Sequence, residues 1–289
     1  MSDEVIDPGN STAAAISRRG FAMAASVAAA GLAAPAGAQS ADEFGKPHAP
    51  VVREDDPDIT VSRPQLHPSA GGPIEAYAAQ PRSNRAMNAG IVVIQAIWGV
   101  DAQLRDVVRR FAKAGYVAIA PALYSRLNAP SGDGATDFTV FRPFAQQMNE
   151  QGFVGTDVAA AYDWIVRESP RAKAGITGFC MGGGIVLREV VATDTFAAAV
   201  PFYGGVKPVM DEASKIKTPL LGNYGARDTS ILPQDVTAFF AHVTAPHDLK
   251  IYPEAGHAFF DDTRESYVAS AASDAWRRTL AWFQKYLTG

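Results

Sequence analysis

The sequence predicts an α/β protein in which a mostly parallel central sheet is covered by helices on both faces. From residue 59 onward, short apolar runs bounded by turn residues alternate with segments of helical period, as in parallel sheets with helical crossovers. Several runs are apolar at nearly every position, which is typical of strands buried on both faces. The 289 residues are 47% hydrophobic and 19% charged, a composition that fits one globular domain and not a disordered chain.

Each predicted element follows from its local sequence. Residues 101–115 place apolar side chains on one helical face, with Asp101 positioned to cap the helix and Gly115 to end it. The other helices show the same period, and the strands are short apolar runs between turn residues. In chain order we expect a strand at 89–97, a helix at 101–115, a strand at 116–123, a long connection at 124–150, a helix at 154–168, strands at 174–179, 197–204 and 218–225, a helix near 233–244, a strand at 247–256 and a closing helix at 265–287.

The N-terminal residues have the layout of an export signal. An arginine pair, Arg18 and Arg19, precedes an apolar stretch and a small-residue sequence that ends at Ala38, and SRRGF resembles a twin-arginine signal. The apolar stretch is shorter than the ~20 residues that span a bilayer. We therefore expect export by the twin-arginine (Tat) machinery to the periplasm, cleavage after Ala38 and no membrane association afterwards. The predicted organisation is a signal peptide at 1–38, a polar linker at 39–58 and a catalytic domain at 59–289.

Composition argues against several kinds of partner and cofactor. A net charge of -4 with no block of lysines or arginines gives no footprint for nucleic acid. One cysteine and five scattered histidines offer neither an intramolecular disulfide nor zinc-type spacing, so no metal is expected. The stretch CMGGGIV has no G-x-G-x-x-G opening and no phosphate-loop lysine, so no nucleotide cofactor is expected.

The lone cysteine, Cys180, lies where a predicted strand meets a predicted helix. The stretch Gly178-Phe179-Cys180-Met181-Gly182 fits the G-x-nucleophile-x-G elbow, a strained turn whose flanking positions have no room for side chains. A free cysteine is also among the residues most often buried as inert filling. The motif alone leaves both interpretations open.

Two later residues favour the nucleophile. Asp228 follows the predicted strand at 218–225, and His257 follows the strand at 247–256. Nucleophile, acid and histidine is the chain order of α/β-hydrolases, and the carboxyl ends of parallel strands share one edge of a sheet. A capping aspartate and a surface-loop histidine are the alternatives for each residue alone. Their joint order and placement predict a triad.

The triad predicts acyl transfer through a thioacyl-enzyme intermediate. Cys180, as the thiolate, attacks a carbonyl, and His257 passes the proton to the leaving oxygen and then activates water. Asp228 holds the imidazole in its working tautomer. The backbone N–H groups of Met181 and Ile97 are the expected oxyanion hole.

Over residues 73–287 the chain resembles the dienelactone hydrolases, the cysteine-nucleophile branch of the α/β-hydrolase fold. The matching segments are QAIWGVDAQLRDVVRRFAKAGYVAIAPALY, GITGFCMGGG, YGARD and EAGHAFFDDTRESYVASAA, in this order. The resemblance implies the α/β-hydrolase fold in a single catalytic domain and a carboxylic ester hydrolase that opens an enol-lactone, dienelactone to maleylacetate. It carries the triad over as Cys180, Asp228 and His257.

Two positions depart from the family pattern. Family enzymes have a glutamate in Q-E-I-(F/W)-G-V that holds the cysteine neutral at rest, and this chain has Ala96 there. They also have a substrate-binding arginine four residues after the catalytic histidine, where this chain has Asp261. We therefore expect Cys180 to rest as a thiolate paired with His257 and to be prone to oxidation. We also expect a lactone or small ester without negative charge as the substrate, since Asp261 would repel an anion.

Loops decide specificity on this fold, so the substrate contacts and the exact activity stay open. The arginines of the long connection are either substitute cations for the substrate or solvated loop charges. One alternative function is a general esterase or thioesterase on the same fold, and another is a non-catalytic binding or thiol-sensing relative. The candidate substrate-binding residues are Trp98, Arg126, Arg142 and Phe259.

Overall fold

The computed structural model describes residues 47–82, 88–169 and 171–288. The predicted signal peptide at 1–38, with its cleavage after Ala38, lies outside the described residues, as does the first part of the predicted linker. Within the described part, no helix is both long and apolar enough to cross a membrane.

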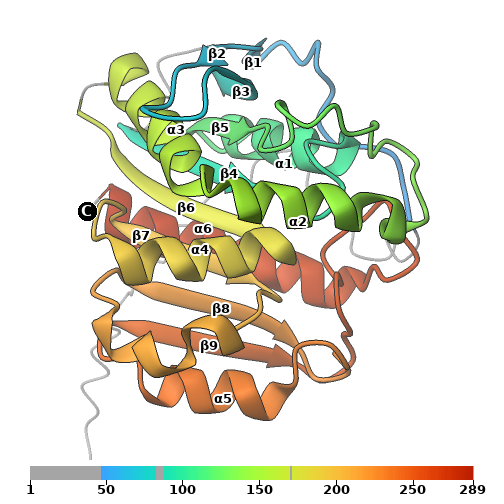
Figure 1. Cartoon of the computed structure of the whole chain (residues 1–289), viewed down its shortest axis with the longest axis vertical. Coiled ribbons are helices and arrows are strands. Elements are labelled where there is room, and N and C mark those ends of the chain that lie inside the picture. The colour runs from blue at the N-terminus through green and yellow to red at the C-terminus, as the bar shows by residue number, and fades with distance from the viewer. Residues whose placement is uncertain (1–46, 83–87, 170, 289) are drawn as a thin grey trace, which may run out of the picture. The chain divides into compact units, whose positions relative to one another are not determined.

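Nine strands of the described residues form a central sheet in the order β1-β3-β5-β4-β6-β7-β8-β9, with β2 paired to β3 (Figure 1). Neighbours are parallel from β5 to β9, whereas β3 runs antiparallel to β1, β2 and β5. The predicted, mostly parallel sheet is therefore confirmed. The strands are β1 (Ile59–Ser62), β2 (Gln65–Leu66), β3 (Ile74–Pro81), β4 (Ala89–Ile94), β5 (Val117–Pro121), β6 (Lys173–Phe179), β7 (Ala198–Phe202), β8 (Leu220–Gly225) and β9 (His247–Tyr252).

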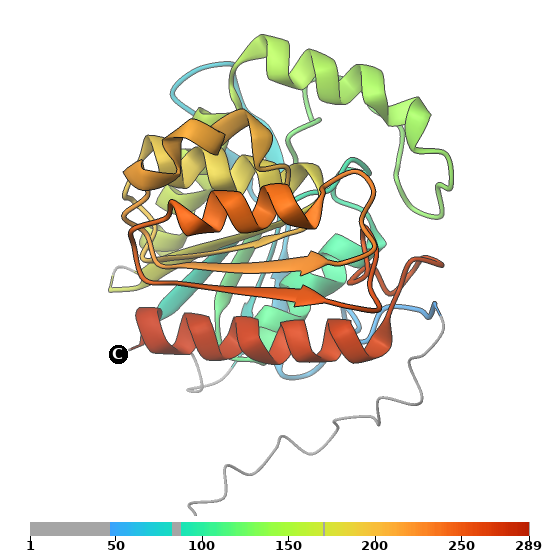
Figure 2. The ribbon, with the colours of Figure 1, turned by 90° about the horizontal axis from the view of Figure 1, so that it is seen from below.

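Helices cover both faces of this sheet, as predicted (Figure 2). α1 and α6 pack on one face, and α3, α4 and α5 pack on the other (Figures 1 and 2). The central strands are buried at every position, because both of their faces meet helices. The helices are α1 (Ala102–Lys113), α2 (Arg142–Gln151), α3 (Val154–Glu168), α4 (Met181–Ala192), α5 (Pro233–Ala241) and α6 (Ala269–Leu287), with 3-10 turns η2 (Phe138–Phe141) and η3 (Lys207–Lys215).

Local chemistry explains the ends of α1. The Asp101 side chain accepts a hydrogen bond from the N–H of Leu104 at 3.0 Å, as an N-cap does. At the other end, Gly115 has φ 103, in the left-handed region where glycine carries no side-chain penalty. The predicted helix boundaries at Asp101 and Gly115 are thus confirmed.

The structure corrects several element predictions. The strand expected at 247–256 ends at Tyr252, and the closing helix expected from residue 265 begins at Ala269. The strand expected at 89–97 ends at Ile94, and a turn closed by the N–H of Gly99 on the carbonyl of Ala96 (3.2 Å) follows it. The long connection at 124–150 contains η2 and most of α2. Met148 is the one buried residue of α2, so this helix has no apolar face that the sequence pattern could reveal.

The predicted linker is fixed to the domain over its described part. Asp106 of α1 is fully buried and accepts hydrogen bonds from the backbone N–H groups of Val51 (2.9 Å) and Val52 (2.8 Å). The N–H of His48 donates to the carbonyl of Asp262 at 2.7 Å. A polar, proline-containing segment reads as a linker by composition, but these backbone hydrogen bonds hold it across α1 and the loop after β9.

Candidate active site

Cys180 occupies a strained turn between β6 and α4. Its φ of 56 and ψ of -114 lie outside the ordinary regions for a residue with a side chain. A Cβ on Gly178 would come within 2.5 Å of the Gly182 carbonyl oxygen, and one on Gly182 within 2.5 Å of the Ile94 carbonyl oxygen. The two glycines of the predicted elbow are therefore required by backbone packing on both sides of the cysteine.

The sheet brings three predicted residues to one edge. Cys180 is half-buried at the end of β6, Asp228 follows β8 and His257 follows β9. The Cys180 N–H donates to the carbonyl of Phe202 on the neighbouring strand β7 at 3.1 Å, which ties the turn to the sheet. Because β6, β8 and β9 are all parallel, their carboxyl ends lie together, as the sequence order predicts.

The three side chains form a continuous hydrogen-bonded chain. His257 Nε2 lies 3.0 Å from Cys180 Sγ, and His257 Nδ1 lies 2.7 Å from Asp228 Oδ2. The imidazole thus bridges the thiol and the carboxylate, one ring nitrogen to each. The His257 side chain is 31% exposed, so water can reach the histidine.

Asp228 is held in place by its other oxygen. The carboxylate is buried, and Oδ1 accepts hydrogen bonds from the N–H groups of Ser230 (2.8 Å) and Ile231 (2.9 Å). Burial raises the pKa of Asp228, but the hydrogen bonds from His257, Ile231 and Ser230 outweigh it, so the pKa lies below its ordinary value. Asp228 is therefore an oriented anion at neutral pH.

The charge state of His257 follows from its two partners. Burial lowers the pKa of His257, whereas the hydrogen bonds and charges of Asp228 and Cys180 raise it, to about 10 in total. The ring is therefore an imidazolium at neutral pH. That is the charge state in which a histidine supports a neighbouring thiolate.

The two predicted oxyanion donors lie beside this chain. Met181 is the first residue of α4, so its N–H belongs to the helix turn that has no intrahelical acceptor. No described residue accepts a hydrogen bond from the N–H of Ile97. The Tyr124 hydroxyl, which the sequence pattern does not reveal, lies 3.2 Å from the Ile97 carbonyl oxygen and 3.6 Å from Met181 Sδ, and it can donate its single hydrogen to either acceptor. Tyr124 is one residue beyond a predicted strand, and that position was the available signal.

No carboxylate faces the thiol from position 96. Ala96 is partly buried, and the side chain of its neighbour Gln95 is turned to accept the Leu123 N–H at 3.0 Å. Within the described ranges, His257 is the hydrogen-bond partner of the Cys180 thiol. No side chain in the described part of the chain therefore takes the place of the glutamate that the family resemblance implies.

Arg126 is not a solvated loop charge, and its role in binding substrate stays a prediction. Its two terminal nitrogens donate to Asp157 at 2.8 and 2.7 Å, and one also donates to the Gly72 carbonyl at 2.8 Å. The side chain is 14% exposed and that of Asp157 2%. Arg126 is therefore a partly buried cation whose ion pair joins the long connection to α3.

The other two peripheral candidates differ from each other. Arg142 is exposed, with its guanidinium 4.8 Å from the Phe138 ring centre, as expected of a solvated loop charge. The prediction that Phe259 contacts substrate is wrong, because Phe259 is 0% exposed and packs between Tyr203 and Tyr252. The cause is a left-handed turn at Ala258, where φ is 59.

Trp98 is partly buried, and an arginine guanidinium stacks on its ring. The sequence pattern did not predict this contact. The guanidinium carbon of Arg264 lies 3.6 Å from the Trp98 ring centre. The same guanidinium donates through Nε to Asp261 at 2.9 Å. Asp261 is therefore buried and ion-paired, and not the free anion that its position in the family pattern suggested. The signal in the sequence was the spacing of three between these opposite charges in DDTRES.

Metal chemistry has no evident donor set in the described ranges, where no group of three or more His, Cys, Asp or Glu side chains could hold an ion.

The fold and the site together define an α/β-hydrolase-fold protein with a cysteine at the nucleophile elbow. A family model described as the dienelactone hydrolase family matches residues 74–287. The chain belongs to the dienelactone hydrolase family, and it is a hydrolase of that family.

Relatives and solved structures agree with this assignment. The chain is 34% identical over 232 residues to a protein of Escherichia coli strain K12 named "Putative carboxymethylenebutenolidase", covering 76% of this chain and 85% of the relative. A Yersinia pestis protein of the same name is 35% identical over 237 residues, covering 76% and 86%. The crystal structure of a "Putative Dienelactone Hydrolase" from Klebsiella pneumoniae is 33% identical with a TM-score of 0.68, covering 79% of this chain and 99% of that one. A dienelactone hydrolase-like phosphotriesterase from metagenomic libraries, 20% identical with a TM-score of 0.67, covers 80% and 99% and shares the fold.

Proposed function

We propose that this protein hydrolyses a lactone or small carboxylic ester through a Cys180–His257–Asp228 triad and a thioacyl-enzyme intermediate. The observation that carries the proposal is the hydrogen-bonded chain from Sγ to the imidazole (3.0 Å) and from the imidazole to the carboxylate (2.7 Å). Its position at a glycine-flanked elbow supports the same reaction.

In the first half of the reaction, the Cys180 thiolate adds to the carbonyl carbon and the carbonyl oxygen takes the negative charge. The N–H groups of Met181 and Ile97 are the donors proposed for this oxyanion. When the intermediate collapses, the C–O bond of the ester breaks and the His257 imidazolium gives its proton to the leaving oxygen. A thioester and an alcohol result, and in a lactone both remain parts of one molecule.

In the second half, neutral His257 takes a proton from water and the hydroxide attacks the thioester carbonyl. Collapse breaks the C–S bond, so the carboxylic acid leaves and the thiolate returns. The acid loses its proton to the medium, and His257 keeps the one taken from water. Asp228 remains ionised and keeps the imidazole oriented throughout.

The proposal is tested with 4-nitrophenyl acetate and dienelactone as two substrates and with C180A, C180S and wild-type protein. We expect wild-type hydrolysis with a burst of one nitrophenolate per chain if deacylation is slow, and a mass increase of one acetyl group at Cys180 in quenched protein. C180A should lose the activity by more than about 10³-fold. Full activity in C180A would overturn the mechanism, and an inactive, folded wild-type protein would favour a binding or thiol-sensing role.

We also propose that the chain is exported through its N-terminal twin-arginine segment. The support is the sequence layout of residues 17–38. Cell fractionation should find the protein in the periplasm with residue 39 at its N-terminus. Replacing Arg18 and Arg19 by lysines should retain the precursor in the cytoplasm, whereas unchanged export of that variant would contradict the proposal.

A further inference from the structure

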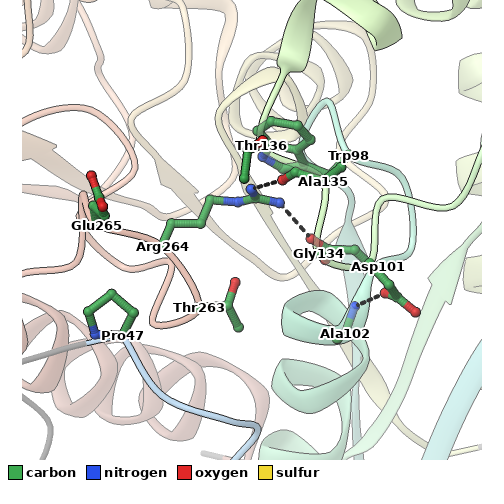
Figure 3. Close-up of a pocket in the computed structure, with 11 residues that line it drawn as sticks. Pro47, Trp98, Asp101, Ala102, Gly134, Ala135, Thr136, Thr263, Arg264 and Glu265 are labelled. Atoms are coloured by element: carbon green, nitrogen blue, oxygen red, sulfur yellow. Dashed lines mark hydrogen bonds and ion pairs between the residues drawn. The ribbon is translucent and has the colours of Figure 1, made fainter.

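A cavity of about 530 Å³ lies beside Trp98, separate from the triad residues. Figure 3 shows Arg264 extending toward Trp98 and Ala135, with Thr263 and Glu265 on the same loop. The side chains used below are Trp98, Asp101, Asp133, Thr136, Arg264 and Glu265. The volume is in the range that accommodates a small organic ligand.

The loops that line the cavity also carry the proposed catalytic groups. Trp98 directly follows the proposed oxyanion donor Ile97. Arg264 is on the loop that contains His257, seven positions later (264 − 257 = 7). The cavity is therefore lined by residues of the same two loops that carry a proposed oxyanion donor and the proposed base.

The arginine of the cavity has no unshared charge to offer a ligand. Arg264 Nε donates to Asp261 at 2.9 Å, Nη1 donates to the Ala135 carbonyl at 2.5 Å, and Nη2 lies 3.4 Å from Asp101 Oδ2. One face of its guanidinium is covered by Trp98 at 3.6 Å. The carboxylates of Asp261 and Asp101 thus neutralise the charge of Arg264. Arg264 in turn holds three loops together through its contacts.

The other charged groups make the cavity acidic. Asp133 accepts the Ala102 N–H at 2.7 Å and the Arg105 guanidinium at 2.8 Å, so it is a balanced anion. Glu265 is exposed and has no hydrogen-bond or ion-pair partner among residues 47–82, 88–169 and 171–288. Among the charged and hydroxyl side chains named above, the groups left for a ligand are this carboxylate and the Thr136 hydroxyl, and the carboxylate accepts hydrogen bonds and donates none.

We propose that this cavity is the subsite for the substituent of the ester substrate, and that it selects a substituent carrying hydrogen-bond donors and no negative charge, such as an ammonium or hydroxyl group. The inference rests on the proposed hydrolase function and adds the substrate class. Asp261 and Asp101 keep Arg264 from binding an anion, and Glu265 attracts a cation.

The test is a matched series of 4-nitrophenyl esters with acyl chains of equal length: hexanoate, 6-aminohexanoate and the monoester of adipate. We expect kcat/KM to fall in the order ammonium, neutral, carboxylate, with at least a tenfold range between the charged esters at low salt. A parallel pair on the alcohol side, acetylcholine against its neutral isostere 3,3-dimethylbutyl acetate, covers the other orientation of the substrate.

Two variants test which residues set the preference for the ammonium ester over the carboxylate ester. E265Q removes the exposed, unpartnered carboxylate and should reduce the ammonium-to-carboxylate ratio about fivefold or more, since unit charges a few ångströms apart interact by about 1 kcal/mol or more. D261N releases Arg264 from its ion pair and should raise activity toward the adipate ester selectively. E150Q, which removes an exposed acid of α2, is the control and should leave the ratio unchanged.

The outcomes separate the two proposals. Cys180-dependent hydrolysis of the neutral ester, with no charge preference in either series or with a preference for the carboxylate, overturns the subsite and leaves the hydrolase standing. A charge preference that E265Q and E150Q change equally also overturns the subsite. Absence of hydrolysis for every ester overturns both.

Discussion

His257 Nε2 lies 3.0 Å from Cys180 Sγ, and no carboxylate in the described part of the chain hydrogen-bonds to that thiol. The thiol therefore has a single proton partner, a histidine that is itself held by Asp228 at 2.7 Å. In this arrangement nothing competes with the imidazole for the proton. We therefore expect this arrangement to make the proposed nucleophile ready to react before substrate arrives.

Alkylation kinetics test this readiness. Because the pKa of His257 is raised to about 10, the ring stays cationic beside the sulfur across neutral pH, and we expect the rate of carbamidomethylation to depend less steeply on pH between pH 6 and pH 8 than it does in H257Q. A thiol without such a partner gains about tenfold per pH unit below its pKa. H257Q should restore that steep dependence. A steep wild-type profile would contradict the prediction, and iodoacetamide consumption followed by mass spectrometry measures it.

Position 96 gives a second, independent test. Glutamate in A96E would place a competing carboxylate at the turn before Ile97, so we expect slower alkylation at pH 7 and slower oxidation by hydrogen peroxide than in the wild type. A96Q is the matched control, since it adds similar volume without the charge. Equal rates in A96E, A96Q and wild type would show that the side chain at 96 does not govern the thiol.

The elbow glycines predict a contrast in stability between two alanine variants of one helix. In G182A the new Cβ would lie 2.5 Å from the Ile94 and Gln95 carbonyl oxygens, so we expect a loss of about 3 kcal/mol or failure to fold. In G184A the nearest atom lies at 3.6 Å, and alanine favours a helix interior by up to about 1 kcal/mol. Urea unfolding compares the two, and equal stabilities would contradict the elbow packing.

Asp101 predicts a pH dependence of stability. Burial and the charges of Asp261 and Asp133 raise its pKa to about 6, against the lowering effects of the Leu104 N–H and Arg264. The unfolded chain loses this proton near pH 4 and the folded one near pH 6, so ionisation costs stability as pH rises between these values, by about 2–3 kcal/mol in total.

D101N removes that cost while keeping the N-cap, since asparagine caps helices as well as aspartate does. The difference in unfolding free energy between D101N and wild type should therefore shift in favour of the variant from pH 4 to pH 7. The attraction to Arg264 exists only when Asp101 is ionised and is already included in the pKa of about 6. A difference independent of pH would contradict the raised pKa.

Variants of the ion pair between Arg126 and Asp157 test whether Arg126 stabilises the fold or contributes to substrate binding. R126A leaves Asp157 buried and unpaired, so we expect a loss of about 3–5 kcal/mol in unfolding free energy. The KM for a neutral ester should change less than twofold at a temperature where the variant is folded. The double variant R126A/D157A should recover part of the stability. A large rise in KM with unchanged stability would place Arg126 in the substrate site.

Sequence alone predicted the elements with a strong period. The helix at 154–168 was predicted with the bounds it has as α3, because Val158, Ala161 and Ile165 form one buried face. The sequence pattern does not predict α2, because Met148 is the one residue of this helix that is buried. β1 and β2 are short and pair with β3, whose alternation is weak, and such pairing depends on contacts that no local pattern contains.

The candidate site also contains residues whose placement the sequence predicts and residues whose placement depends on tertiary contacts. The approach of Cys180, Asp228 and His257 followed from chain order and the shared edge of a parallel sheet. The burial of Phe259 did not, because it depends on the positive φ of Ala258, and a residue other than glycine rarely adopts it. The pairing of Arg264 with Asp261 depends on how one loop folds back on Trp98, which spacing suggests but cannot orient.

The docked leading segment has a practical consequence. The N–H of His48 is tied to the carbonyl of Asp262, on the loop that carries His257. The far end of α6 lies at the opposite side of the sheet from that loop (Figure 2). A label or affinity tag at the C-terminus should therefore leave the proposed turnover unchanged.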